Sequence, residues 1–323
     1  MKAITYAAYG TAEVLRLAEM ERPVPKEGEV LLRVRAASVN PLDWHFMRGT
    51  PQLVRMATGL RKPKWPRLGV DVAGQVEALG KGVTQFQPGD IVFGTCRGAF
   101  AEYACTVEGK LALKPASLTF EQAAAVPVAA LSALQSLRDK GRLQRGQKVL
   151  INGAAGGVGT FAVQSAKALG AEVTGVCSTR NGNMVRSIGA SHVVDYTQEN
   201  FTKMGQQYDL IVDTIGNHTL SACRRALTKK GTLVLVGGPD TGGLLGPLAG
   251  LLQTLVVSWF VSQKLRPFMA RVRQADLLVL RELIEAGHLM PVIDRTYPLS
   301  DVPAAIRYLE EGHARGKVVI TMG

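Results

Sequence analysis

A glycine-rich turn between an apolar strand and a helical run is the part of this sequence best suited to chemistry. Residues 148–152 are apolar and β-branched, and residues 158–169 repeat apolar side chains at helical spacing. Small residues stand at Ala154 and Gly156 in the turn between them and at Gly159 near the start of the helical run. In such a strand-turn-helix unit, backbone N–H groups at the helix N-terminus bind a pyrophosphate. We therefore predict a dinucleotide site formed by Ala154, Ala155, Gly156, Gly157 and Val158, the alternative being an ordinary glycine-rich turn.

The end of the second strand of this unit indicates which dinucleotide is bound. An acidic residue there holds the ribose 2′-hydroxyl of NAD, whereas basic groups accommodate the 2′-phosphate of NADP. Here Cys177 stands at the acid position, and Ser178, Thr179 and Arg180 follow it. Two hydroxyls and a guanidinium suit a phosphate dianion, so we predict NADPH. The alternative for Arg180 is a solvated residue at a helix start.

Composition and charge limit the class of protein. With 323 residues, 46% of them hydrophobic and 20% charged, the chain is long enough for two well-packed domains. Its four cysteines form no C-x-x-C pair, and no signal-peptide segment opens the chain, so we predict a cytoplasmic protein without disulfides. The net charge of +12 could attract nucleic acid, an anionic membrane or an anionic cofactor. No nucleic-acid-binding motif accompanies the charge, and we predict no nucleic acid partner.

One apolar stretch, residues 244–261, approaches the length of a membrane span. It contains glycine, proline and polar residues, and no second span follows. We interpret it as a buried helix leading into a strand, and a subunit interface is one place where it could be buried. A peripheral membrane contact is the alternative.

The order of the expected elements indicates an α/β protein with two kinds of domain. Residues 1–115 contain short strands and turns without a long helical period, which favours a β-rich, barrel-like domain. Residues 119–143 are helical around Pro127. Strands and helices then alternate, as in a doubly wound parallel sheet. The expected strands are 148–152, 172–177, 192–195, 210–214, 232–236 and 317–320, and the expected helices are 158–169, 183–188, 220–227, 275–286 and 302–310.

Several motifs together resemble the zinc-free quinone oxidoreductase branch of the medium-chain dehydrogenase/reductase superfamily. They are Ser38–Asp43, Gly69–Gly74, Phe86–Asp90, Gly98–Tyr103, the loop 154–159, Gly189–Tyr196 and Gly316–Ile320. The resemblance implies a GroES-like domain over residues 1–122, a Rossmann domain that binds NADP over 123–265, and a return to the first domain over 266–323. It also implies a homodimer.

The residues at the zinc positions of the superfamily differ from those of its alcohol dehydrogenases. Those enzymes carry a cysteine where this chain has Asn40, and Gly-His-Glu where it has Gly69-Val70-Asp71. A catalytic zinc needs three such protein ligands, so we expect no metal. Without a Lewis acid, the favoured substrates already hold an activated acceptor, namely a quinone or an α,β-unsaturated carbonyl.

The segment after Asn40 is the expected substrate wall. Quinone-type relatives often have a tyrosine two residues after the aspartate of Asn-Pro-x-Asp, and His45 stands there. It could donate a proton to the developing enolate or quinol oxygen, or it could be a packing residue. Trp44 could stack on the acceptor or pack in the core. We predict Asn40, Trp44 and His45 as catalytic residues, although Asn40 and Asp43 could mainly hold the loop.

The resemblance extends the expected cofactor site. Tyr196 matches a contact to the adenosine or 2′-phosphate, and Lys317 matches a lysine near the cofactor cleft, the alternative being a surface lysine before an edge strand. Thr214, Gly237 and Gly238 follow strand ends, where doubly wound sheets bind ligands. A basic run (Arg55, Arg61, Lys62, Lys64, Arg67) could steer an anionic substrate or form a solvated face.

These observations predict an NADPH-dependent, zinc-independent reductase of quinones or α,β-unsaturated carbonyls. The sequence lacks the zinc ligands that an alcohol dehydrogenase of the zinc type would need. The competing hypothesis is an NADPH-binding redox sensor or partner-binding protein without efficient turnover.

Overall fold

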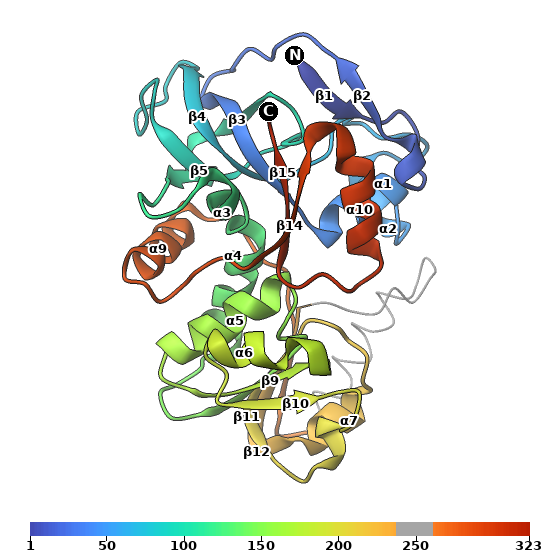
Figure 1. Ribbon diagram of the computed structural model, residues 1–323, viewed down its shortest axis with the longest axis vertical. Helices are drawn as coiled ribbons and strands as arrows, with labels where there is room; N and C mark the ends of the chain where they lie inside the picture. Colours follow the sequence, from blue (N-terminus) through green and yellow to red (C-terminus); the bar gives the residue numbers. More distant parts are fainter. Residues whose placement is uncertain (237–260) are drawn as a thin grey trace. The chain divides into compact units, whose positions relative to one another are not determined.

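The computed structural model describes residues 1–236 and 261–323, which fall into two compact units (Figure 1). The first unit comprises Met1–Leu131 and Val272–Gly323, and the second comprises Ser132–Arg271. Both boundaries lie later in the chain than the predicted ones. Helix α4 (Pro127–Gln135) spans the first boundary. The apolar stretch 244–261 and the predicted site residues Gly237 and Gly238 lie outside the described residues, Val261 excepted.

A seven-stranded, mostly antiparallel sheet forms the centre of the first unit. Its strand order is β14-β15-β3-β4-β5-β7, with β6 also paired to β3, and β1 and β2 form a separate hairpin. The strands are β1 (Lys2–Thr5), β2 (Arg16–Glu19), β3 (Glu29–Val39), β4 (Asp71–Leu79), β5 (Ile91–Thr95), β6 (Tyr103–Val107), β7 (Leu111–Leu113), β14 (Ile293–Pro298) and β15 (Lys317–Thr321). The helices of this unit are α1 (Pro41–Arg48), α2 (Leu53–Thr58), α3 (Phe120–Ala124), α9 (Gln274–Glu285) and α10 (Val302–Glu310), with 3-10 turns η1 (Ala12–Val14), η2 (Glu108–Lys110) and η6 (Leu299–Asp301).

The register of this sheet brings three strand ends together. Ser38 of β3 lies opposite Asp71 of β4, and Val39 lies opposite Val318 of β15. The end of β3 and the beginnings of β4 and β15 therefore meet at one place. Residues more than 240 positions apart in the sequence become neighbours there.

Two helices precede residue 119, although the sequence shows no long helical period there. Helix α1 begins with a capping box formed by Asn40 and Asp43, in which the Asp43 carboxylate accepts a hydrogen bond from the backbone N–H of Asn40. Pro41 occupies the first position of the helix. The helix ends at Gly49, whose φ of 62° is left-handed. Both α1 and α2 are too short for a periodic pattern to be visible in the sequence.

The second unit contains a six-stranded parallel sheet with the order β10-β9-β8-β11-β12-β13. The strands are β8 (Lys148–Asn152), β9 (Glu172–Cys177), β10 (His192–Asp195), β11 (Tyr208–Asp213), β12 (Leu227–Leu235) and β13 (Lys264–Pro267). The helical segments are a π-helical turn η3 (Ser136–Gly141), α5 (Gly157–Ala168), η4 (Thr179–Asn181), α6 (Gly182–Ser187), η5 (Phe201–Lys203) and α7 (Leu220–Arg225). The six-stranded parallel sheet of this unit and the β-rich sheet of the first confirm the predicted α/β fold class. Strand β12 begins at Leu227, where the sequence had indicated the end of a helix.

Each unit has its own core. In the first, apolar side chains of β3, β4 and β15 pack with α10. In the second, β8 and β11 are apolar on both faces because the central strands of a parallel sheet are covered on both sides. No helix of the described segments is long and apolar enough to cross a membrane.

Candidate functional site

A buried polar cluster occupies the place where β3, β4 and β15 meet. The side chain of Asp71 is 0% exposed. Its Oδ2 accepts hydrogen bonds from the Ser38 hydroxyl at 2.8 Å and from Asn40 Nδ2 at 2.9 Å. Its Oδ1 accepts from the backbone N–H of Val128 at 2.9 Å, in the first turn of α4. The carboxylate is thus stabilised by three hydrogen bonds from two segments of the chain, residues 38–40 and the start of α4.

Lys317 supplies the positive charge of this cluster. Its side chain is almost fully buried, and its Nζ lies 2.6 Å from Asn40 Oδ1, 3.2 Å from the carbonyl oxygen of Val39 and 3.4 Å from Asp71 Oδ2. An ammonium group has three N–H donors, and these three acceptors match that number. Burial lowers the pKa of Lys317, and the carboxylates of Asp71 and Asp43 oppose that shift.

The position of Lys317 rules out one alternative of the sequence analysis. The residue is not a surface lysine, and β15 is not an edge strand, because it lies between β14 and β3. A contact of Lys317 with a cofactor stays a prediction. Any such contact requires the ammonium to exchange or share one of its three partners in the cluster.

Asn40 is held at both ends of its amide group. Its Oδ1 accepts from Lys317, and its Nδ2 donates to Asp71 and, at 3.4 Å, to the carbonyl oxygen of Ser38. Its backbone N–H donates to Asp43 Oδ2 at 2.8 Å. These bonds position the start of α1. They support the interpretation that Asn40 and Asp43 hold the loop, whereas a catalytic role of Asn40 stays a prediction.

Asp43 is a second buried carboxyl group in the cluster, and it also accepts from the N–H of Gly69 at 3.2 Å. Burial raises the pKa of Asp43 to about 7. The N–H groups of Asn40 and Gly69 and the charge of Lys317 oppose this shift, while the charge of Asp71 adds to it.

His45 lies near the C-terminal end of α1. Its Nδ1 is 2.7 Å from the carbonyl oxygen of Thr50. Because a carbonyl only accepts, Nδ1 carries the hydrogen and Nε2 is left as the acceptor of the neutral ring. Trp44 stacks beside His45 with ring centroids 3.7 Å apart, and it also packs against the core of the first unit. The core contact favours a packing role for Trp44.

The glycine-rich turn of the second unit lies at the carboxyl end of β8. Gly156 is the N-cap of α5, and no side chain caps this helix. The first N–H groups of a helix have no partner within it, so they point out of the turn as donors for an anion. Ala154, by contrast, uses its N–H to bond the carbonyl oxygen of Val176.

Two glycines of this turn serve different purposes. A Cβ at Gly159 would lie 2.0 Å from the carbonyl oxygen of Gly153, so the close contact between helix and turn requires glycine there. A Cβ at Gly156 would meet only that same oxygen, at 3.4 Å, and the φ of Gly156 is −81°. The fold does not demand glycine at 156. The space beside it fits the pyrophosphate of a dinucleotide, which needs close approach to the backbone.

The end of β9 holds the residues that were predicted to bind a 2′-phosphate. Cys177 is buried, Ser178 Oγ accepts from Asn181 Nδ2 at 3.1 Å, and Tyr196 is exposed one residue beyond β10. The hydroxyl of Thr179 donates to Asp195 Oδ2. The structure thus places Ser178, Thr179 and Tyr196 at one edge of the sheet.

Asp195 is a neighbour of this edge that the sequence analysis did not assign to it. It pairs with Cys177 across β9 and β10, and it also accepts from the N–H and hydroxyl of Thr197. Hydrogen bonds from Thr179 and Thr197 lower the pKa of Asp195, so it is ionised at neutral pH. The strand pairing, visible only in the fold, is the signal that reveals it.

Thr214 follows the central strand β11. Its hydroxyl donates to the carbonyl oxygen of Asn152 at 2.7 Å, which ties the end of β11 to the end of β8. Asp213 accepts from Asn152 Nδ2 and from the N–H groups of Ile215 and Gly216. Thr214 therefore lies beside the glycine-rich turn, and its contact with a cofactor stays a prediction.

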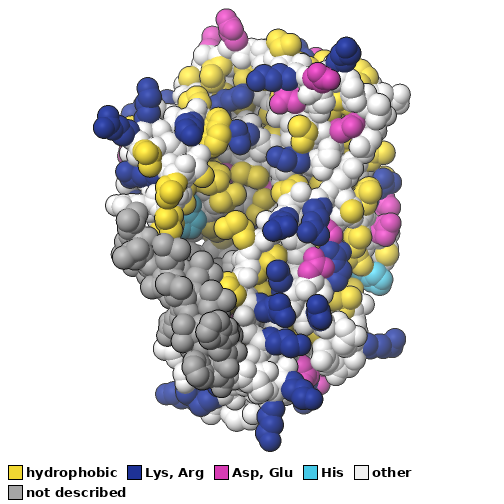
Figure 2. All heavy atoms as spheres, turned by 180° about the vertical axis from the view of Figure 1, so that it is seen from behind, with side chains coloured by type: hydrophobic (Ala, Val, Ile, Leu, Met, Phe, Trp, Pro, Cys, Tyr) yellow, Lys and Arg dark blue, Asp and Glu magenta, His cyan; other side chains and the backbone are white. Residues whose placement is uncertain are grey.

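Positive charge is concentrated in the second unit. Its sequence contains sixteen Lys and Arg against seven Asp and Glu, which is nine of the twelve net charges of the chain. Figure 2 shows many Lys and Arg side chains on one face of this unit. Such a field favours an anionic ligand.

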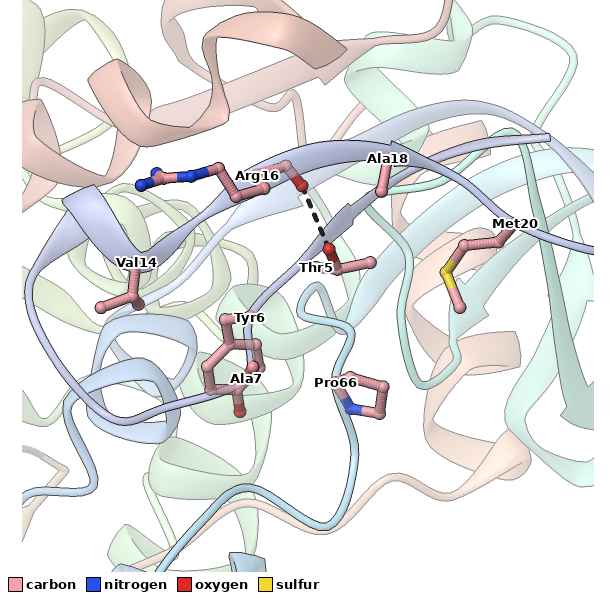
Figure 3. A pocket seen from close by; sticks show the side chains of 8 residues that line it. All are labelled: Thr5, Tyr6, Ala7, Val14, Arg16, Ala18, Met20 and Pro66. Atoms are coloured by element: carbon pink, nitrogen blue, oxygen red, sulfur yellow. Dashed lines mark hydrogen bonds between the residues drawn. The ribbon is translucent and has the colours of Figure 1, made fainter.

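A groove of about 400 Å³ lies in the first unit, along the β1–β2 hairpin (Figure 3). None of the predicted site residues contributes to its lining, which consists of Thr5, Tyr6, Ala7, Val14, Arg16, Ala18, Met20 and Pro66. Among the described residues, no three His, Cys, Asp or Glu side chains form a group that could hold a metal ion.

Comparisons with known proteins agree with this architecture. Residues 26–116 match the family described as alcohol dehydrogenase GroES-like domain, and residues 188–320 match the family described as zinc-binding dehydrogenase. The chain is 37% identical to NAD(P)H oxidoreductase RTN4IP1, mitochondrial, of Mus musculus, over 97% of this chain and 87% of that protein. The chain belongs to the quinone oxidoreductase-like branch of the medium-chain dehydrogenase/reductase superfamily.

Two further members of the superfamily are informative. The chain is 34% identical to the NADPH-dependent alkenal/one oxidoreductase, chloroplastic, of Arabidopsis thaliana, over 99% of this chain and 79% of that protein. The crystal structure of Escherichia coli quinone oxidoreductase complexed with NADPH has a TM-score of 0.84 and 26% identity, and covers 99% of this chain and 100% of that one. This member of the superfamily is thus an NAD(P)H-dependent oxidoreductase of the quinone oxidoreductase and alkenal/one reductase type.

Proposed function

We propose that this oxidoreductase uses NADPH to reduce quinones or α,β-unsaturated carbonyls without a metal ion. The observation that carries the proposal is the β9 edge, where Cys177 replaces an acidic residue and Ser178, Thr179 and Tyr196 gather beside a glycine turn with open helix donors. The concentrated positive charge of the same unit supports an anionic cofactor.

The residues of the second unit fit NADPH in distinct ways. The N-terminus of α5 and the space at Gly156 would hold the pyrophosphate. Ser178 can donate its hydroxyl to the 2′-phosphate, and Arg180 can add a charge-assisted bond. Thr179 is less suited to donate, because its hydroxyl proton is already directed to Asp195. The bound cofactor supplies the hydride.

The first unit supports an acceptor that needs no Lewis acid. Asn40, Val70 and Asp71 are not a set of zinc ligands, and the amide of Asn40 and the carboxylate of Asp71 are bonded to Lys317. A quinone or a conjugated carbonyl needs only a proton donor at its oxygen. His45 can take this role when Nε2 is protonated, while Nδ1 keeps its bond to Thr50.

Consumption of reduced nicotinamide tests the proposal directly. We expect the purified protein to oxidise NADPH with 1,4-benzoquinone and with a linear enal, and not with the matching saturated aldehyde. Turnover of primary alcohols with NADP⁺ at a comparable rate would contradict the choice of substrate class. Tight NADPH binding with no turnover on any acceptor would favour the redox-sensor hypothesis.

Variants test the named residues. Replacing Ser178 and Arg180 by alanine should raise KM for NADPH about tenfold or more and leave KM for NADH nearly unchanged. Equal effects on both cofactors would overturn the NADPH assignment. Replacing His45 by Ala should lower kcat about 100-fold if it transfers the proton, whereas an unchanged kcat would give the histidine a packing role only.

A further inference from the structure

A surface segment between α1 and β4 exposes large apolar side chains. Met56 is 69% exposed and Leu60 is 72% exposed, and Trp65 is 37% exposed five residues further on. Single exposed apolar residues are common on protein surfaces. Here three of them lie within ten residues, Met56 in helix α2 and the other two in the loop that leads from α2 to β4. We call residues 53–67, together with Arg97, the basic apolar edge.

The same segment is positively charged throughout. Between residues 53 and 67 the sequence has five basic residues and no Asp or Glu. Arg61, Lys62 and Lys64 are exposed, and no ion pair within the described part of the chain engages them. The guanidinium of Arg97 lies 3.8 Å from the centre of the Trp65 ring, which adds a sixth cation beside an exposed indole. The region of α2 lies at the left of Figure 2, where Lys and Arg side chains surround hydrophobic ones.

Hydrogen bonds hold part of the backbone of this edge in a defined conformation. The hydroxyl of Tyr9 contacts Thr58 Oγ1 at 2.7 Å and donates to the carbonyl oxygen of Gly59 at 2.6 Å. The N–H of Lys64 donates to the carbonyl oxygen of Thr58 at 2.7 Å, which closes the loop. Gly59 has a φ of 121°, and a Cβ there would lie 2.1 Å from the carbonyl oxygen of Lys62. These bonds and the close contact at Gly59 hold the backbone between Thr58 and Lys64 in one conformation.

We propose that the basic apolar edge docks the protein on an anionic lipid bilayer. Met56, Leu60 and Trp65 would enter the boundary between headgroups and acyl chains, and the surrounding Lys and Arg would contact lipid phosphates. Long basic side chains suit this arrangement, because their methylene stems lie along apolar surface while their charged ends reach the phosphates. A single-stranded nucleic acid needs several open aromatic faces for stacking, whereas this edge has one indole, and Arg97 lies over one face of it. The proposal concerns the surface of the first unit and does not depend on the identity of the electron acceptor.

Flotation of the full-length protein with lipid vesicles tests the proposal. We expect binding to vesicles of phosphatidylcholine and phosphatidylglycerol in equal amounts, weak binding to phosphatidylcholine alone, and release by added salt. The variants K62E/K64E and M56S/L60S should each lower the affinity for the mixed vesicles about tenfold or more. Loss in the first variant alone would indicate charge attraction without insertion and would overturn the apolar part of the proposal.

Matched controls in the second unit separate this edge from the general basicity of the chain. Lys229 and Lys230 are an exposed pair of lysines, and Met269 is 87% exposed, so K229E/K230E and M269S make the same chemical changes elsewhere. We expect both controls to bind vesicles as the wild type does. Equal losses in the controls, or equal binding to neutral vesicles, would overturn the proposal. So would binding of a fluorescent single-stranded oligonucleotide through Lys62 and Lys64 without vesicle binding.

The vesicle result is independent of the proposed function. With the uncharged acceptor 1,4-benzoquinone, which a basic run does not steer, NADPH oxidation in buffer without vesicles should be the same in K62E/K64E, M56S/L60S and the wild type. Failure of turnover with intact vesicle binding would refute the proposed reductase activity alone. Intact turnover without vesicle binding would refute the docking surface alone.

Discussion

The polar groups of the two candidate regions differ in whether the protein itself supplies their hydrogen-bond partners. In the first, Asp71, Asn40 and Lys317 are buried and bonded to one another, and the Lys317 ammonium has one acceptor for each of its donors. In the second, the helix donors above Gly156 have no cap, and charged groups stand at an exposed edge. The first arrangement is satisfied by the protein itself, while the second leaves backbone donors open to a ligand.

This difference separates residues that hold the fold from residues that bind. A buried ion pair contributes little net stability compared with a well-packed apolar pair, yet the loss of one partner is costly, because the remaining charge stays buried. An open helix N-terminus contributes little to folding, yet it determines the affinity for an anion. Variants in the buried cluster should therefore change stability, and variants at the open helix N-terminus should change cofactor binding.

Removal of the cluster's cation should give the largest effect. Replacing Lys317 by Met leaves the Asp71 carboxylate buried without its counter-charge, and we expect a loss of about 3–5 kcal/mol in the free energy of unfolding. Urea denaturation measures this. The same substitution at the exposed Lys81 is the control and should change stability by less than about 0.5 kcal/mol. A loss below about 1 kcal/mol in K317M would show that the cluster tolerates an unpaired carboxylate.

The pH dependence of stability should report the other buried carboxyl of the cluster. Burial raises the pKa of Asp43 to about 7, above the value near 3.9 of an unfolded chain. The contribution of Asp43 to stability is therefore fully present below about pH 4 and is lost as the pH rises through about 7. We expect the difference in unfolding free energy between the wild type and Asp43→Asn to decrease from pH 4 to pH 8. A difference that stays level or grows over this range would contradict the raised pKa.

The sequence predicts the second unit better than the first because its signals are local. The glycine-rich turn, Cys177 and the strand-helix alternation are each visible within about thirty residues, and the parallel sheet confirms the alternation. The cluster of the first unit joins Lys317 to Asn40 and Asp71 across more than 240 positions, and no local pattern indicates such a pairing. For the same reason Asp195 was missed: its place beside Cys177 follows from the register of β9 and β10. Helix α1 was missed because it is too short to show periodicity.

The two glycines of the turn should differ in the same way: Gly156 should affect cofactor binding, and Gly159 should affect the stability of the fold. Replacing Gly156 by Val fills the space beside the helix donors, so we expect the Kd for NADPH to rise roughly tenfold or more with little change in Tm. Replacing Gly159 by Ala forces a Cβ against the carbonyl oxygen of Gly153, so its main effect should be a lower Tm. Calorimetric titration and thermal unfolding of both variants distinguish these outcomes. A large loss of Tm in Gly156→Val would mean that the fold, and not a ligand, requires that glycine.

The acidic neighbour of the β9 edge should give the smallest effect, and one of opposite sign. Asp195 is ionised at neutral pH and bonds Thr179, so its charge repels a 2′-phosphate at the same edge. Over a separation of several ångströms in a solvated setting, removal of one charge should lower KM for NADPH roughly fivefold. We therefore expect Asp195→Asn to improve kcat/KM for NADPH and to leave NADH nearly unchanged. Glu199→Gln removes the same charge from an exposed position four residues along and should change neither. If Asp195→Asn instead weakened NADPH binding, the carboxylate would be holding Thr179 in the orientation that binds the cofactor. The β9 edge would then resemble the buried cluster of the first unit, whose polar groups bond one another, more than an open site.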